Sequence, residues 1–277
     1  MAVLSVSREL GSGGDAVAER LARELGYTLL NHEEFSQAAE RYGLLKGELE
    51  KVDERRPGFI DRFFRERQAV YLDLVQAIVY EYALRDRVVI LGRGGNFLLR
   101  GVRGVLRVRF VASLESRKSR LMAEQGVAAA LAEQYIAQDD QERSGYVKYL
   151  FKQPWGDPHG ADLVINTSRV GEDQVVAFVK ETLAHPAFAG ASPAEDPTLQ
   201  RKAFANGIKA ELITHERLDA SGISVHVAEM GKVFLRGRVN SEEEKEFAVQ
   251  LVRQRAGVSE VVDELVIMPP IEGWYPV

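Results

Sequence analysis

A glycine-rich stretch near the N-terminus, SRELGSGGDA at residues 7–16, has residue types suited to holding an anion. Glycines leave backbone N–H groups bare, so these groups can close around phosphate oxygens while a following helix adds its positive end. The phosphate-loop pattern G-x-x-x-x-G-K-[ST] matches at Gly11, Ser12 and Gly13, whereas Arg8 replaces the first glycine, Gly14 the lysine and Asp15 the hydroxyl residue. By pattern alone this is a weak phosphate loop.

Two other interpretations of the same stretch stay open at this point. The run from Gly11 to Ala16 also fits the dinucleotide-binding pattern G-x-G-x-x-A, with Glu33 where a ribose-binding acid belongs. The stretch is also consistent with an ordinary strand-to-helix turn in which Asp15 caps the helix. The rest of the chain has to decide among the three.

Three arginines further along the chain are candidates for neutralising a polyphosphate. Arg117 and Arg120 lie one helical turn apart in SLESRKSRLM, and Arg143 follows in DDQERSGYVKY. Guanidinium forks bind phosphate oxygens in pairs, and phosphoryl transfer requires mainly positioning and positive charge around the moving group. The alternative is that Arg117 and Arg120 decorate a solvated helix face beside Glu115 and Glu124.

A second glycine loop favours the phosphate-handling interpretation. GRGGN at residues 92–96 follows a predicted strand and places Arg93 among glycines. Because glycines have no side chain, the backbone of this loop can approach an anion closely. Asp140, two residues before Glu142, adds a carboxylate close to Arg143. Together these residues indicate one concerted site.

The elements that must position these residues alternate between strand and helix. Hydrophobic patterns predict strands at 2–7, 27–30, 87–92, 105–112 and 161–167, and helices over 15–25, most of 33–86 and 171–184, with a break at Pro57 and Gly58. Such alternation predicts an α/β fold with a parallel sheet covered by helices on both faces, whose ligands bind beyond the carboxyl ends of the strands. The mostly helical stretch 33–86 is expected to cover an acceptor.

A domain boundary is predicted near residue 186. The stretch 185–198, HPAFAGASPAEDPT, contains three prolines and little periodicity, which is typical of a linker. We assign residues 1–185 to a first domain, 186–198 to the linker and 199–269 to a small α+β domain. Its predicted order is helix 200–213, strands 222–227 and 232–239, helix 241–256 and strand 258–268.

Composition restricts the classes of function. The net charge of -5 gives no overall field for nucleic acid, and the lack of cysteine excludes disulfides and thiolate-bound metals. The five histidines have no ligand-like spacing, so a metal site would need oxygen ligands, as Mg²⁺ prefers. Because the chain has neither a signal-like start nor a run of about 18 apolar residues, we expect a cytoplasmic protein that is not transmembrane.

Five segments taken in order resemble the cytidylate-kinase-like family. They are SRELGSGGDAVAERLARELGY, ILGRGGNFLL, VRFVASLESRKSRL, DDQERSGYVKYLF and ADLVINTS. The resemblance covers about residues 1–185 and includes the lysine-less loop S-R-E-x-G-S-G-G that this family tends to show. It implies a five-stranded nucleoside-monophosphate-kinase core that uses ATP and Mg²⁺ on CMP or dCMP.

The resemblance also implies roles for individual residues. The loop from Arg8 to Asp15 would hold the donor phosphates, with Ser12 or Asp15 as the Mg²⁺ ligand. The resemblance places Arg117 and Arg120 at the start of a mobile lid, which Asp140 and Arg143 complete. Arg93 would face the acceptor beside Asn31 and Glu34. The family commonly has aspartate and arginine where this chain has Asn31 and His32, which is a departure at the acceptor side.

Aromatic residues lie near the predicted lid. Tyr146, Tyr149, Phe151 and Trp155 are placed to stack on a base, although a stripe at helical spacing is more often part of a core. Both interpretations stay open.

The C-terminal segment 199–269 resembles a BON domain. The resemblance rests on V-x-V-x-x-x-x-G-x-V-x-L-x-G-x-V across Val225–Val239 and on GVSEVVDELVI at 257–267. It implies a protein or lipid partner and no catalytic role for this segment.

The sequence thus predicts an ATP-dependent nucleoside monophosphate kinase with a C-terminal interaction module. The alternative is a nucleotide-sensing protein of weak or no activity, because the phosphate-loop lysine is absent and Asn31 departs from the family pattern. A third possibility is a scaffold that depends on the BON-like domain alone.

Overall fold

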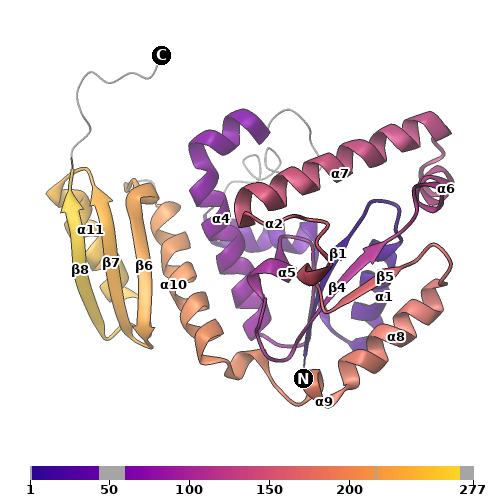
Figure 1. The fold of residues 1–277 in the computed structure, drawn as a ribbon. Helices are drawn as coiled ribbons and strands as arrows, with labels where there is room; N and C mark the ends of the chain where they lie inside the picture. The colour runs from indigo at the N-terminus through magenta and orange to yellow at the C-terminus, as the bar shows by residue number, and fades with distance from the viewer. Residues whose placement is uncertain (1, 44–59, 216, 269–277) are drawn as a thin grey trace.

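Two β-sheets of different size organise the chain, and helix α10 (Pro197–Ile213) lies between them (Figure 1). The computed structural model describes residues 2–43, 60–215 and 217–268, and of residues 60–70 it describes only the backbone. The predicted break at Pro57 and Gly58 lies outside the described residues.

The larger sheet has five strands in the order β2-β3-β1-β4-β5, and every neighbouring pair is parallel. The strands are β1 (Val3–Arg8), β2 (Thr28–Leu30), β3 (Val88–Leu91), β4 (Val105–Val111) and β5 (Leu163–Asn166). Strand β1 is central, with Val6 opposite Leu91 on one side and Val108 on the other. Five of its six residues are buried, as expected for a parallel strand with both faces covered.

Helices cover both faces of this sheet, which confirms the predicted α/β fold class. Helices α1 (Gly14–Leu25) and α8 (Glu172–Ala184) pack on one face. Helices α4 (Ile60–Leu84) and α5 (Gly95–Leu98) pack on the other, and α2 (His32–Arg41) lies against α4. In α1, buried Val17, Ala18, Leu21 and Ala22 recur at helical spacing and therefore form one apolar stripe.

Two further helices cross the end of the sheet where the strands terminate. Helix α6 (Leu114–Gln125) follows β4, and α7 (Ala129–Phe151) then runs back from α6 towards α4 (Figure 1). Because the strands are parallel, their carboxyl ends meet beneath these two helices. The candidate residues of the sequence lie in this region.

The smaller sheet belongs to the C-terminal domain and has the order β6-β7-β8. Its strands are β6 (Ile223–Glu229), β7 (Lys232–Val239) and β8 (Glu260–Ile267), with β6 antiparallel and β8 parallel to β7. Helices α10 and α11 (Glu242–Gln254) pack on one face, which gives the predicted order helix, strand, strand, helix, strand.

The connection between the two parts is packed against the first domain. It contains α9 (Pro186–Ala189), and the Ser192 hydroxyl donates a hydrogen bond to the Asp86 carboxylate at 2.6 Å. The domain limits at residues 185 and 199 stay a proposal.

Helix α10 contributes side chains to both hydrophobic cores. Leu199 and Ala210 are buried in the core around α4, whereas Ile208 and Leu212 are buried in the core of the small sheet. At 100° per residue, Leu199 and Ala210 share one face of α10, whereas Ile208 and Leu212 lie on the opposite face. The two sheets are therefore joined by one shared helix.

Within residues 2–43, 60–215 and 217–268, no helix combines the length and the apolar character that are needed to cross a lipid bilayer.

Replacing Leu199 by alanine should lower the free energy of unfolding by about 2–5 kcal/mol, because it leaves a cavity in the core around α4, called the first core below. Phe178→Ala is the control, since that side chain is 63% exposed, and its effect should stay within about 0.5 kcal/mol. Urea unfolding followed by circular dichroism measures both. An equal effect of the two substitutions would show that α10 does not contribute to the first core.

Candidate active site

The glycine loop connects β1 to α1 at the centre of the larger sheet. Gly11 and Gly13 have φ angles of 75° and 78°, in the left-handed region that favours glycine. A Cβ at Gly11 would lie 2.6 Å from the carbonyl oxygen of Arg117. The loop is therefore shaped by its glycines and lies directly against α6.

The loop presents backbone N–H groups that are available to an anion. Helix α1 has Gly13 as its N-cap, with no side-chain hydrogen bond at this end. Among the described residues, the N–H groups of Gly11 and Gly13 find no acceptor. Uncapped N–H groups together with the positive end of a 12-residue helix form a favourable environment for phosphate oxygens.

The position of the missing lysine has no room for a side chain. A Cβ on Gly14 would lie 2.6 Å from Cβ of Arg8 and 2.9 Å from Cδ2 of Phe110. The first neighbour is the Cβ atom of a buried arginine and the second belongs to a buried phenylalanine ring, and neither can move aside easily in a close-packed interior. The absence of lysine is thus part of the packing of this loop, and positive charge has to come from elsewhere.

Arg8 supplies charge at the end of β1. Its guanidinium group is buried and contacts the Asp15 carboxylate, with Nε 3.0 Å and Nη2 2.9 Å from Oδ1. Asp15 lies in the first turn of α1 and is not its cap, so the interpretation of Asp15 as a helix cap is wrong. Asp15 instead pairs with Arg8 at the mouth of the loop.

Arg117 and Arg120 both reach the glycine loop from α6. Arg117 donates to the carbonyl oxygen of Leu10 at 2.7 Å and makes a bidentate pair with Asp140 at 2.8 and 2.7 Å. Arg120 donates to the Gly11 carbonyl oxygen at 3.2 Å. Arg117 is only 5% exposed, so the solvated helix face proposed as an alternative is excluded for it.

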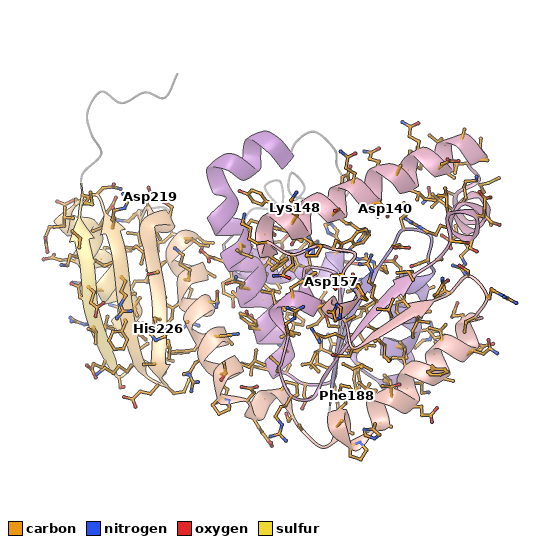
Figure 2. All side chains as sticks on the ribbon, viewed as in Figure 1. Asp140, Lys148, Asp157, Phe188, Asp219 and His226 are labelled. Carbon is orange, nitrogen blue, oxygen red and sulfur yellow. The ribbon has the colours of Figure 1, made fainter. Side chains whose placement is uncertain are left out.

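Arg143 belongs to the same region but has a different partner. Its guanidinium group is buried and pairs with Asp139, one turn earlier on α7, with Nη2 3.1 Å from Oδ1. Figure 2 shows Asp140 on the side of α7 that faces the sheet, where it meets Arg117. Arg8, Arg117 and Arg143 therefore each face an aspartate close to the loop.

A cavity of about 530 Å³ opens between the glycine loop, α1, α6 and α7. Gly11 and Gly13 line it, together with five acidic side chains: Asp15, Glu19, Glu124, Asp139 and Glu142. No lysine or arginine is among the lining residues within the described part of the chain. An anion in this cavity therefore requires the arginine forks behind the carboxylates or a bound cation.

The residues here fit Mg²⁺ only when a ligand supplies further oxygens. Across residues 2–43, 60–215 and 217–268, no group of three or more histidine, aspartate or glutamate side chains forms a metal site. Asp15 is partly exposed in the cavity, whereas the Ser12 hydroxyl is buried and accepts a long hydrogen bond, 3.4 Å, from the Gly14 N–H. Asp15 is thus the better placed of the two predicted ligands, and Mg²⁺ usually takes one or two carboxylates plus substrate phosphates.

The predicted acceptor residues form a separate group around α2. Arg93 is buried, donates to the Tyr71 hydroxyl at 3.0 Å, lies 2.7 Å from Nδ1 of His32 and covers the ring of Phe35. Asn31 is the N-cap of α2, because its side chain accepts from the N–H of Glu34 at 3.0 Å.

Glu34 is engaged by a tyrosine of α4. Its carboxylate accepts a hydrogen bond from the Tyr82 hydroxyl, which in turn lies 3.2 Å from Nη2 of Arg41. Burial and the hydrogen bond to Glu34 raise the pKa of the Tyr82 hydroxyl above its usual value. The structure therefore brings Arg93 towards the start of α2, while Asn31 and Glu34 are engaged within the protein.

Sequence reasoning missed a network around Glu9. The Glu9 carboxylate accepts from the N–H of Ala112 at 3.1 Å and from Arg109 at 3.5 Å, and it lies 3.6 Å from Arg117. Burial lowers the pKa of Arg109, and the charge of Glu9 opposes this shift. The available signal was the pair of arginines at alternate positions of VLRVRFV, which places both on one face of the strand.

Thr167 was missed as well. Its hydroxyl donates to the Ser12 carbonyl oxygen at 2.6 Å and accepts from Arg120 at 3.0 Å, so it connects the end of β5 to the glycine loop. No feature of the sequence beyond a hydroxyl residue after a predicted strand pointed to this role.

The four aromatic residues are divided between core and surface. Phe151 stacks on Phe97 with ring centroids 5.3 Å apart, and Tyr146 packs against Tyr71 and Phe151. Trp155 packs against the Arg109 guanidinium group and, with Tyr149, lines a second cavity beside Lys148 and Lys152. Stacking on a base stays a prediction for Tyr149 and Trp155.

The strand order excludes the dinucleotide-binding interpretation. In that fold the second strand lies beside the first, in the order 3-2-1-4-5-6. Here β2 lies at the edge, and β3 separates it from β1. The loop therefore belongs to the phosphate-loop class of topologies.

Gly14→Ala should lower the free energy of unfolding by about 1–3 kcal/mol, because the added Cβ overlaps Arg8 and Phe110. Gly145→Ala is the matched control. It lies in α7, where no atom of the described residues is within 4 Å of an added Cβ, so the substitution should be neutral or stabilising by up to about 1 kcal/mol. Urea midpoints of both variants measure the difference, and a Gly14→Ala protein as stable as the parent would contradict the crowding at this position.

Comparisons with known proteins agree with this topology. Residues 3–169 match the Cytidylate kinase-like family and residues 203–269 match the BON domain. The cytidylate kinase of Thermococcus kodakarensis is 29% identical over 185 residues, covering 66% of this chain and 88% of that protein. That of Thermococcus sibiricus is 29% identical over 198 residues, covering 69% and 95%.

Two other similarities are more limited. The uronate isomerase of Corynebacterium glutamicum is 36% identical over 102 residues, but the chain spans only 20% of that protein's length. An uncharacterized protein from Eubacterium ventriosum shares the fold, with a TM-score of 0.51 at 20% identity over 66% of this chain and 98% of that one. The match over residues 3–169 spans more than half of the sequence, and the chain thus belongs to the cytidylate kinase-like family and carries a C-terminal BON domain.

Proposed function

We propose that this protein transfers a phosphoryl group from ATP to a nucleoside monophosphate, with CMP or dCMP as the favoured acceptor. The observation that carries the proposal is the uncapped start of α1, with the bare N–H groups of Gly11 and Gly13. Arg117, which is buried, and Arg120, which is partly buried, reach this loop from α6. Similarity to cytidylate kinases of Thermococcus supports the choice of acceptor.

In the proposed reaction an oxygen of the acceptor phosphate attacks the γ-phosphorus of ATP. The bond from that phosphorus to the β,γ-bridging oxygen breaks, and ADP leaves with the bond's electron pair. The loop N–H groups and the end of α1 would hold the donor phosphates. Arg117, Arg120 and Arg143 would balance charge on the moving group, and Arg93 would hold the acceptor phosphate.

The ion pairs of the site suggest how it responds to a nucleotide. Asp140 and Asp139 now satisfy the forks of Arg117 and Arg143, and Asp15 satisfies part of Arg8. Phosphate oxygens present the same kind of acceptor as a carboxylate, so they can share or replace these partners. Mg²⁺ bound at Asp15 would supply positive charge between the donor phosphates and the carboxylates of the cavity.

Arg117→Ala and Arg143→Ala should each lower kcat/KM by roughly 100-fold or more, since each removes a fork expected to act in the transition state. Release of ADP across a panel of nucleoside monophosphates measures this loss. Arg236→Ala is the control, because Arg236 lies in β7 and pairs with Glu264 of the C-terminal domain. Full activity of the Arg117 and Arg143 variants would rule out the proposed role of the arginines.

A nucleotide-sensing protein without turnover is the second candidate. It is favoured by the crowding at Gly14, which keeps an ammonium group out of the loop, and by Asn31, which is occupied as a helix cap. Tight binding of ATP with no turnover of any acceptor would select this candidate over the kinase.

A further inference from the structure

The C-terminal domain rests on the helices of the acceptor side. Helix α10 lies between the small sheet and α4 (Figure 1). Leu199, Ala203 and Ala210 pack into the core around α4, while Ile208 and Leu212 face β6 and β7. The interface is therefore continuous with both hydrophobic cores.

A buried ion pair lies within this apolar interface. The ammonium group of Lys209 donates to the carbonyl oxygens of Ala220 and Ile223, and it lies 3.7 Å from Oδ2 of Asp73 on α4. Burial lowers the pKa of Lys209 and raises that of Asp73, and each charge opposes the shift of the other. Because desolvation costs free energy, such a pair contributes little to stability and is better suited to fixing one docking position.

A second contact joins the end of α2 to the same domain. Gly43 lies against Thr214 closely enough that an added Cβ would be 3.5 Å from the Thr214 Cβ. The Tyr42 hydroxyl donates to Glu81 of α4 at 2.9 Å. Burial raises the pKa of this hydroxyl, and the positive charge of Arg255 in the C-terminal domain opposes that shift. Both α2 and α4 are thus in contact with the C-terminal domain.

Helix α4 links this interface to Arg93. Tyr71 and Asp73 are two residues apart, which places them about 200° apart around the helix axis and hence on nearly opposite faces. Asp73 faces Lys209, whereas the Tyr71 hydroxyl accepts from Arg93 at 3.0 Å. A displacement of α4 at Lys209 would therefore move the group that holds Arg93.

We propose that the BON domain is the support of the acceptor side, and that Lys209 and Asp73 are positioning residues that fix α4 so that Tyr71 holds Arg93 in place. That Arg93 holds an acceptor rests on the proposed function, whereas the link from Lys209 and Asp73 through α4 to Arg93 does not. A partner that displaced the BON domain would then alter acceptor binding and leave the ATP site unchanged.

Lys209→Met and Asp73→Asn, made in the full chain, test this proposal. Lys245→Met is the matched control, because Lys245 also donates to a backbone carbonyl, that of Leu265, and pairs with an aspartate, Asp263, wholly within the C-terminal domain. We expect the KM for CMP to rise about tenfold in the first two variants, with the KM for ATP unchanged and the control at the parent value.

Hydrogen exchange provides a readout that does not depend on turnover. Amides around Tyr71 in α4 and in the loop 92–96 should exchange faster in Lys209→Met and Asp73→Asn than in the parent or in Lys245→Met. Asp73→Asn keeps the side-chain volume and an acceptor for Lys209, so it remains informative if Lys209→Met folds poorly. Exchange in α4 that is unchanged, or equally faster in the control, would overturn the proposal. If the parent protein turns over no acceptor, the proposed function fails while the exchange result still decides this inference.

Discussion

Close packing at Gly14 is the constraint from which the rest of the site follows. Because Arg8 and Phe110 occupy the space that a side chain would need, the start of α1 carries no cation of its own. Positive charge reaches it from outside, through Arg8 at the end of β1 and through Arg117 and Arg120 on α6. The charge at the loop therefore depends on how α6 packs against it and on the aspartates that pair with its arginines.

This arrangement has an electrostatic balance of its own. Each of the buried guanidinium groups of Arg117 and Arg143 faces an aspartate, and Glu9 lies between Arg109 and Arg117. Buried charges are tolerated when they are paired and hydrogen-bonded. The site is thus organised before any ligand arrives, and a ligand has to compete with acceptors that are already in place.

Patterns local in sequence predicted most of the fold, and contacts between distant segments explain what they missed. The parallel sheet and its helices follow from apolar runs and helical spacing, and the glycine loop from its residue types. The pairing of Arg117 with Asp140 depends on how α7 lies over α6, which no spacing reveals. The pair of Arg143 with Asp139 is instead an i,i+4 contact within α7, which the spacing of the two residues allows. Arg109 and Glu9 meet only because β1 and β4 are neighbours in the sheet.

The two-sided burial of α10 has a consequence for the order in which the chain acquires its structure during synthesis. Segments made first generally fold first. The outer face of α4, however, is covered by Leu199 and Ala210. These two residues leave the ribosome more than a hundred residues after α4 begins. The cytidylate kinase-like domain is therefore complete only once the opening helix of the following domain has been translated. A nascent chain that stalled in the connecting segment would display an apolar stripe, which is a surface that chaperones and proteases recognise.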